Sequence, residues 1–119
     1  MKNFLAIYIG SESSPGRANW DKLDEAARKE RMGAGIEAWG NWMNTHKKSI
    51  VVTGTPLGKT KRMSSSGLAD TRNNMTGYVV LQAETHEEAA RMFENHPHFA
   101  IFPGDSVEIM ECLPIPGQS

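Results

Sequence analysis

Apolar and polar positions divide this chain into four short apolar stretches and two longer stretches with helical periodicity. The short stretches are rich in β-branched or aromatic residues and end at turn residues, which predicts strands over residues 3–9, 50–57, 77–83 and 106–112. Helices are predicted from about residue 21 to 44 and from residue 85 to 96. The order β-α-β-β-α-β is that of an α+β, ferredoxin-like fold, in which a four-stranded antiparallel sheet carries both helices on one face.

The first predicted helix has an apolar stripe and several glycines. Asp21 or Asn19 is expected to cap its start. Residues at spacings of three to five form the stripe: Leu23, Ala27, Met32, Ile36, Trp39 and Met43. Each helical glycine costs about 1 kcal/mol relative to alanine. The helix therefore either breaks near residues 33–35 or uses a glycine for close packing, and we favour close packing at Gly40.

The second predicted helix begins with a capping box, in which Thr85 caps and Glu88 bonds back. Its inner stripe is Ala89, Met92, Phe93 and His96, and Pro97 cannot continue it. Between the second and third strands, the polar residues 59–74 are expected to form either an ordered hairpin or a mobile flap.

Two helices on one face leave the other face of the sheet uncovered. Candidate residues on that face are Tyr8, Val51, Val80 and Met110. The hydrophobic fraction is 39%, which is lean for a small domain and favours additional burial by association. A second copy of the same sheet is the simplest partner, so we expect a homodimer that pairs through its sheet faces.

The bulk composition narrows the classes of function. The 119 residues suit a single domain over residues 1–119, and 13 basic against 14 acidic residues argue against a nucleic-acid surface. One cysteine, Cys112, excludes a disulfide within the chain and favours a reducing, cytoplasmic location, where we interpret it as a packing residue. No apolar run is long enough to span a membrane, and the short N-terminal apolar run does not resemble a secretory signal. No cofactor is predicted.

His96-Pro97-His98 with Asp105 is the best chemical constellation. A histidine can transfer a proton near neutral pH, and a carboxylate can orient its ring, so these residues are the catalytic candidates. A structural interpretation competes with this one: His96 ends a helix and His98 caps a turn. A single His-x-His is a weak signal for a metal, and no metal ligand is assigned.

Other residues are candidate ligand-binding groups. Tyr78 opens the third strand, and Trp42 points away from the stripe of the first helix, towards a pocket rim or an interface. Lys59 belongs to a group of basic residues that could attract an anion, although solvated charge on a hairpin is the favoured explanation for them. Residues 54–60 resemble a phosphate-binding loop, but the glycine spacing is one residue short and no helix follows, so we reject that motif.

Several short motifs occur in the order found in the YCII-related proteins, which are small bacterial proteins with a dimeric α+β barrel fold. They are residues 4–8, Ala38-Trp39-Gly40 with Trp42, residues 54–57, Gly77-Tyr78, residues 87–89, His96-Pro97, and Gly104 with residues 106–109. The chain resembles this family over nearly its whole length, and best from Gly77 onward. The resemblance implies the fold and the dimer.

The resemblance implies little about activity, since most members of the family have none assigned. One branch is proposed to use a histidine–aspartate pair with an early histidine, but this chain has no histidine before His46. Another branch carries an Asp-Gly-Pro-Phe motif, whose place here is taken by residues 67–71. The sequence thus favours a homodimer that binds a small molecule. Its alternatives are a proton-transfer enzyme of lyase or isomerase type, with His96 or His98 as base, and a non-catalytic regulatory or dimerisation module.

Overall fold

The computed structural model describes residues 1–117. Its elements, in chain order, are β1 (Lys2–Ile9), α1 (Arg17–Lys22), α2 (Glu25–Thr45), β2 (Ile50–Val52), β3 (Thr60–Ser64), β4 (Gly67–Thr71), β5 (Met75–Ala83), α3 (His86–Arg91), α4 (Pro97–Ala100) and β6 (Ser106–Glu111). In this described part of the chain, none of the helices combines the length and the apolar character needed to cross a bilayer.

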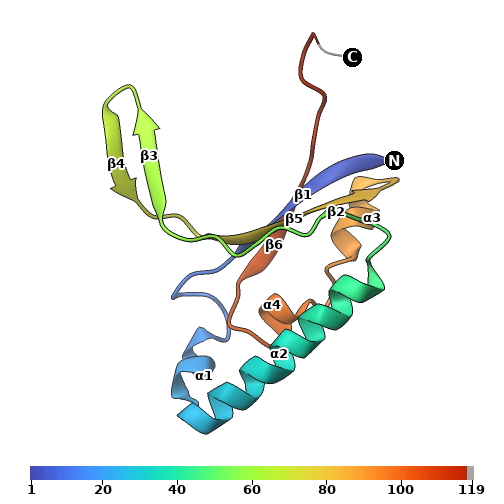
Figure 1. Ribbon diagram of the computed structural model, residues 1–119. Helices are drawn as coiled ribbons and strands as arrows, with labels where there is room; N and C mark the ends of the chain where they lie inside the picture. The colour runs from blue at the N-terminus through green and yellow to red at the C-terminus, as the bar shows by residue number, and fades with distance from the viewer. Residues whose placement is uncertain (118–119) are drawn as a thin grey trace.

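One antiparallel sheet organises the molecule. Its strand order is β2-β5-β1-β6, with β1 in the centre between β5 and β6. The helices lie on one side of this sheet, while the β3–β4 hairpin and the C-terminal segment extend from the other side (Figure 1). This is the predicted ferredoxin-like α+β fold. Residues 59–74 contain the β3–β4 hairpin, in which Thr60–Ser64 pairs with Gly67–Thr71.

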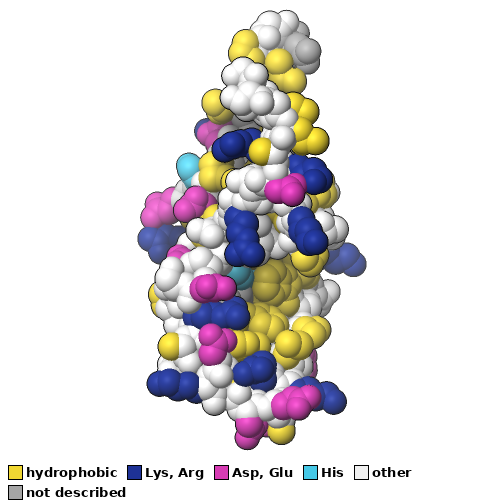
Figure 2. All heavy atoms as spheres, turned by 90° about the vertical axis from the view of Figure 1, so that its left-hand side faces the viewer, with side chains coloured by type: hydrophobic (Ala, Val, Ile, Leu, Met, Phe, Trp, Pro, Cys, Tyr) yellow, Lys and Arg dark blue, Asp and Glu magenta, His cyan; other side chains and the backbone are white. Residues whose placement is uncertain are grey.

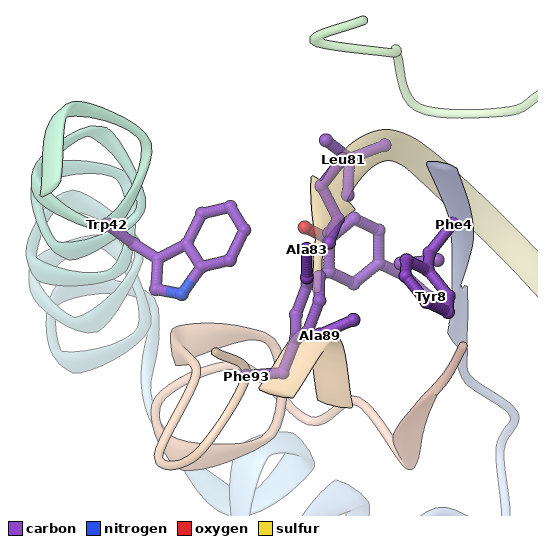
Figure 3. Packing of buried hydrophobic residues seen from close by; sticks show 9 residues of the cluster. Phe4, Tyr8, Trp42, Leu81, Ala83, Ala89 and Phe93 are labelled. Atoms are coloured by element: carbon purple, nitrogen blue, oxygen red, sulfur yellow. The ribbon is translucent and has the colours of Figure 1, made fainter. Parts of the chain in front are cut away.

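The hydrophobic core fills the space between the sheet and the helices. Alternate residues of β1 and β5 face the helices because successive side chains of a strand point to opposite faces. Trp42 reaches from α2 towards the sheet and lies beside Phe93 (Figure 3). The buried cluster comprises Phe4, Ala6, Tyr8, Trp42, Val79, Leu81, Ala83, Ala89 and Phe93.

The first predicted helix is in fact two helices. Asp24, rather than Asp21 or Asn19, caps α2 by accepting a hydrogen bond from the Ala27 N–H, and the short α1 precedes it. The covered side of α2 also differs from the predicted stripe. Its buried or half-buried residues are Ala27, Arg28, Gly35, Ala38, Trp39, Trp42 and Met43. Met32 and Ile36 are exposed because the N-terminal half of α2 extends beyond the sheet, beside α1 (Figure 1).

The glycines of α2 differ from expectation. The helix does not break, and a Cβ at Gly40 would meet no atom within 4 Å, so Gly40 is not the point of close packing. Gly35 has that role, because a Cβ there would collide with the ring of Phe102. The predicted glycine contact therefore exists, one and a half helical turns earlier in the chain.

The second predicted helix also divides into two. The Thr85 hydroxyl accepts a hydrogen bond from the Glu88 N–H at 3.1 Å and starts α3, which is the first half of the predicted capping box. The predicted return bond from the Thr85 N–H to the Glu88 carboxylate does not form within residues 1–117. The chain then turns through Asn95, whose φ is 57°, and α4 begins at Pro97. His96 is therefore the N-cap of α4 and does not end the preceding helix. The residue before a proline avoids helical dihedrals, which explains the extended conformation of His96.

The opposite face of the sheet carries a row of apolar residues. Val52 pairs with Val80, Val80 with Leu5, and Leu5 with Met110. Tyr8 was predicted on this face, but it is buried on the helical side. Cys112 was predicted to pack in the last strand, but it is exposed and follows the end of β6. This one row of the uncovered face is thus apolar, while Gln82 and Glu108 lie in neighbouring rows.

Candidate functional site

A buried cluster of aromatic and imidazole rings joins the centre of the sheet to α2 and α4. His96 is fully buried, and its Nε2 lies 3.3 Å from the hydroxyl oxygen of Tyr8. Trp39 meets the imidazole of His96 edge-on, with ring centroids 4.5 Å apart at 90°. The rings of Tyr8 and Trp39 are 4.8 Å apart. This cluster brings the predicted candidate His96 together with Tyr8, a residue that the sequence did not assign to a site.

The hydrogen bonds of His96 determine its tautomer. The backbone N–H of His98 donates to His96 Nδ1 at 3.0 Å, so Nδ1 carries a lone pair and no proton. A neutral imidazole then has its proton on Nε2, which donates to the Tyr8 oxygen. Both ring nitrogens are therefore occupied, and the imidazole acts as a donor to Tyr8. This arrangement leaves His96 no free lone pair with which to accept a proton from a ligand.

Burial holds both partners in their neutral forms. It lowers the pKa of His96 from 6.5 to about 3, and nearby His98 and His46 contribute to the shift as further positive charges. Burial also raises the pKa of the Tyr8 hydroxyl well above its usual range. At neutral pH the pair is an uncharged imidazole and an uncharged phenol, which suits a polar group inside an apolar core.

His98 is bound by backbone groups on the other side of α4. Its Nε2–H donates to the carbonyl of Ile9 at 2.7 Å. Burial lowers the pKa of His98, and the backbone of Ile9 and Ser106 together with the charge of Asp105 oppose that shift. Asp105 itself is exposed and uses its N–H to bond Ile9. The ring of His98 is thus oriented by a strand carbonyl, where the sequence suggested a carboxylate.

Next to this cluster lies a cavity of about 310 Å³. Trp39 and Met43 of α2 form one side, and the segment after β2 with the start of β5 forms the other. Its ten lining residues are Tyr8, Trp39, Met43, Thr53, Gly54, Thr55, Pro56, Thr76, Gly77 and Tyr78. They include apolar, aromatic and hydroxyl side chains but no acidic or basic residue. The volume is at the lower end of the range for small-molecule sites.

The cavity wall depends on how residues 53–57 fold against the edge of β5. The Leu57 N–H donates to Thr76 and the Tyr78 N–H donates to Thr55, so this segment continues the sheet irregularly after β2 ends. Gly54 has a φ of 71°, and a Cβ there would collide with the carbonyl of Tyr78. Glycine is therefore required for the close approach of the two backbones.

The other predicted site residues lie in different places. Tyr78 lines the cavity, as proposed for a ligand-binding residue. Trp42 does not: its indole N–H donates to the Met92 carbonyl at 2.7 Å and its ring belongs to the core. Lys59 lies at the base of the hairpin, in a separate hollow. Within residues 1–117, no three His, Cys, Asp or Glu side chains gather as a metal site requires.

Sequence reasoning missed Tyr8 and the segment of residues 53–56 as parts of one site, and it favoured core packing for Trp39. The signal for the segment was present, because a Gly-Thr-Pro sequence directly after a strand predicts a turn at the sheet edge. Tyr8 carried no comparable signal. Its assignment depends on strand register, and a shift of one residue moves a side chain to the other face.

Comparison with solved structures finds similarity to a 5-chloro-2-hydroxyhydroquinone dehydrochlorinase (TftG) from Burkholderia phenoliruptrix AC1100, in complex with 2,5-dihydroxybenzoquinone. The identity is 17%, the TM-score is 0.49, and the match covers 91% of this chain and 90% of that chain. No protein-family model matches the sequence, and a search of curated proteins finds no match. At this identity and TM-score the similarity carries no argument about function, and the fold assignment rests on strand order and register.

Proposed function

We propose that this protein binds a small, flat, uncharged organic molecule in the cavity between α2 and the edge of β5. The observation that carries the proposal is the composition of the cavity wall. Aromatic rings offer stacking surfaces, threonine and tyrosine hydroxyls offer hydrogen bonds, and none of the ten lining residues is acidic or basic. An ionised ligand would lose hydration there without gaining a countercharge, so a neutral ligand is favoured.

The buried Tyr8–His96 pair supports the same proposal. Tyr8 lines the cavity, and its hydroxyl oxygen accepts a hydrogen bond from the His96 Nε2–H. The O–H of Tyr8 therefore stays available as a donor. A carbonyl, ether or ring-nitrogen acceptor on the ligand would complete that hydrogen bond. His96 then positions Tyr8 and does not itself take a proton, which is why binding is proposed here in preference to catalysis by a histidine base.

Thermal-shift measurements with 2-naphthol and quinoline test this proposal, since a ligand that binds the native state raises the melting temperature. We expect both probes to stabilise the wild type. Thr53→Trp places a large ring at the mouth of the cavity and should remove the effect. Ser65→Trp, in the turn of the exposed hairpin, is the matched control and should retain it. Equal stabilisation of all three proteins would place the probes elsewhere.

We also propose that two copies pair through the uncovered sheet face, as the homodimer expected from the sequence. The apolar row Val52–Val80–Leu5–Met110 supports this, because an uncovered apolar sheet face favours association. The radius of gyration is 16.5 Å, against roughly 13–14 Å for a compact chain of this length. The hairpin and C-terminal segment account for this extension, and both lie on the side where a partner would sit (Figure 1).

We also propose that the chain belongs to the YCII-related family. The strand order β2-β5-β1-β6 is the one that the family resemblance implies, and the Gly54-Thr55-Pro56 motif forms part of the cavity wall. A sequence profile built from homologues of this chain tests the assignment. It should place Gly54, His96 and Gly104 in the same columns as the corresponding family motifs.

A further inference from the structure

Two further hollows follow the cavity along α2. A shallow apolar hollow, lined by Ile36, Trp39, Gly40, Pro56 and Phe102, shares Trp39 and Pro56 with the cavity. A third hollow of about 240 Å³ lies between α1 and the segment after α4, and it shares Phe102 with the second. The three hollows are therefore adjacent to one another along α2, and we call this row of hollows the groove.

The far end of this groove differs from the cavity because it contains a cation. Arg31 lines the third hollow together with Trp20 and Asn19. One of its guanidinium N–H groups donates to the Ile101 carbonyl at 3.2 Å, which fixes the side chain at the rim. Arg31 makes no ion pair with any residue in the range 1–117. A guanidinium has five N–H donors, so several stay available for an anion.

The surface view agrees with this arrangement. Figure 2 shows a hollowed apolar patch in the middle of one face, with both basic and acidic side chains around it. The exposed fraction of Ile36 is 63%, which is high for a large apolar side chain beside a cavity. An apolar strip that leads from a neutral cavity to a single guanidinium is complementary to an amphiphile with one anionic end.

We propose that the groove binds an amphiphilic monocarboxylate, with its apolar body in the cavity and across Trp39 and Ile36 and its carboxylate paired with Arg31. This inference rests on the proposed function, because the part of the ligand inside the cavity is still uncharged, while the carboxylate lies outside it beside Arg31. It adds the chemical class of the ligand and a specificity residue, Arg31, that lies outside the cavity. A carboxylate held by a guanidinium forms short, charge-assisted hydrogen bonds.

Calorimetric titration with decanoate, 1-decanol and butanoate tests the inference. Wild type should bind decanoate, and butanoate should bind at least tenfold more weakly because it cannot span the groove. Arg31→Gln keeps a donor for Ile101 but loses the charge, so it should weaken decanoate about tenfold or more and change 1-decanol by less than about twofold. Lys29→Gln, an exposed cation on the same helix, is the matched control and should change neither.

The outcomes separate this inference from the proposed function. If 2-naphthol binds but decanoate does not, or if Arg31→Gln and Lys29→Gln behave alike, the carboxylate assignment is overturned and the cavity remains. If Thr53→Trp leaves decanoate binding unchanged, the hollows do not act as one groove. If Ile36→Glu alters the oligomeric state and decanoate does not bind, the strip is a protein contact, which also overturns the proposal.

Discussion

His96 Nε2 lies 3.3 Å from the hydroxyl oxygen of Tyr8, and the N–H of His98 occupies the other ring nitrogen of His96. This relationship ties α4 to the central strand and makes the imidazole a neutral donor. Replacing Tyr8 by phenylalanine leaves that donor buried without a partner. We expect Tyr8→Phe to lower the free energy of unfolding by about 1–3 kcal/mol, measured by urea denaturation at pH 7.

The neutral state of His96 predicts how stability depends on pH. Burial lowers its pKa from 6.5 to about 3, so between these values the unfolded chain binds a proton that the folded chain does not. His96 therefore contributes stability above about pH 6.5, and the contribution is lost as the pH falls towards 3. The slope should be on the order of 1.4 kcal/mol per pH unit in that window. Urea denaturation at a series of pH values measures it.

The matched variant for the pH experiment is His96→Asn. Asparagine is a good N-cap and keeps an acceptor for the His98 N–H, but it does not titrate in this range. The slope below pH 6.5 should become smaller in this variant, with the part due to His98 remaining because its pKa is also lowered. An unchanged slope would show that His96 is not the buried neutral group.

Gly104 lies between α4 and β6, where there is no room for a side chain. A Cβ there would collide with both the carbonyl and the imidazole of His98. We expect Gly104→Ala to cost about 1–3 kcal/mol of unfolding free energy, as overpacking does. Gly40→Ala is the control, since its Cβ meets nothing within 4 Å, and it should stabilise α2 by about 1 kcal/mol. Chemical denaturation of both variants measures whether the free energy of unfolding falls in Gly104→Ala and rises in Gly40→Ala.

Much of the fold was accessible from the sequence, for identifiable reasons. The four sheet strands were predicted within a few residues, apart from β2, which ends at Val52 because residues 53–57 pair irregularly. Thr85 marked the start of α3 correctly because its hydrogen bond to the Glu88 N–H is a local interaction. The division at Asn95 had a signal in the His96-Pro97 pair, since a residue before proline is rarely helical.

The site was less accessible because it depends on tertiary contacts. The predicted stripe of α2 included Met32 and Ile36, which are exposed because the sheet does not extend beneath them. Trp42 was expected at a pocket rim and is in the core, since α3 and α4 cover that side of the helix. Periodicity identifies a helix, but it does not show where along the helix its neighbours end.

Because the backbones of Gly54 and Tyr78 lie so close together, a side chain at Gly54 should reduce both ligand binding and the stability of the fold. Alanine at this position would need a φ of 71° and would collide with the Tyr78 carbonyl, so the cavity wall must move. We expect Gly54→Ala to cost about 1–3 kcal/mol and to abolish the thermal shift with 2-naphthol. Gly58→Ala is the control, because its Cβ would meet no atom within 4 Å. It should keep both the wild-type unfolding free energy and the thermal shift with 2-naphthol.

The uncovered sheet face predicts how the dimer responds to charge. Val80 lies in the middle of the apolar row, so a glutamate there would place two carboxylates in a desolvated interface. Sedimentation velocity at micromolar concentration should show a dimer for wild type and a monomer for Val80→Glu. Met32→Glu, an exposed position of α2 on the helical side of the sheet, should remain dimeric. A monomeric wild type would contradict the proposed pairing.

The most direct test of the binding site is a crystal structure of the protein grown with 2-naphthol. The account predicts ligand density between Trp39 and residues 53–56, with the ligand oxygen within hydrogen-bonding distance of the Tyr8 hydroxyl. It also predicts that His96 keeps its bond to the His98 N–H in the complex. A ligand bound elsewhere, or a cavity filled by the protein's own side chains at saturating probe, would contradict the account.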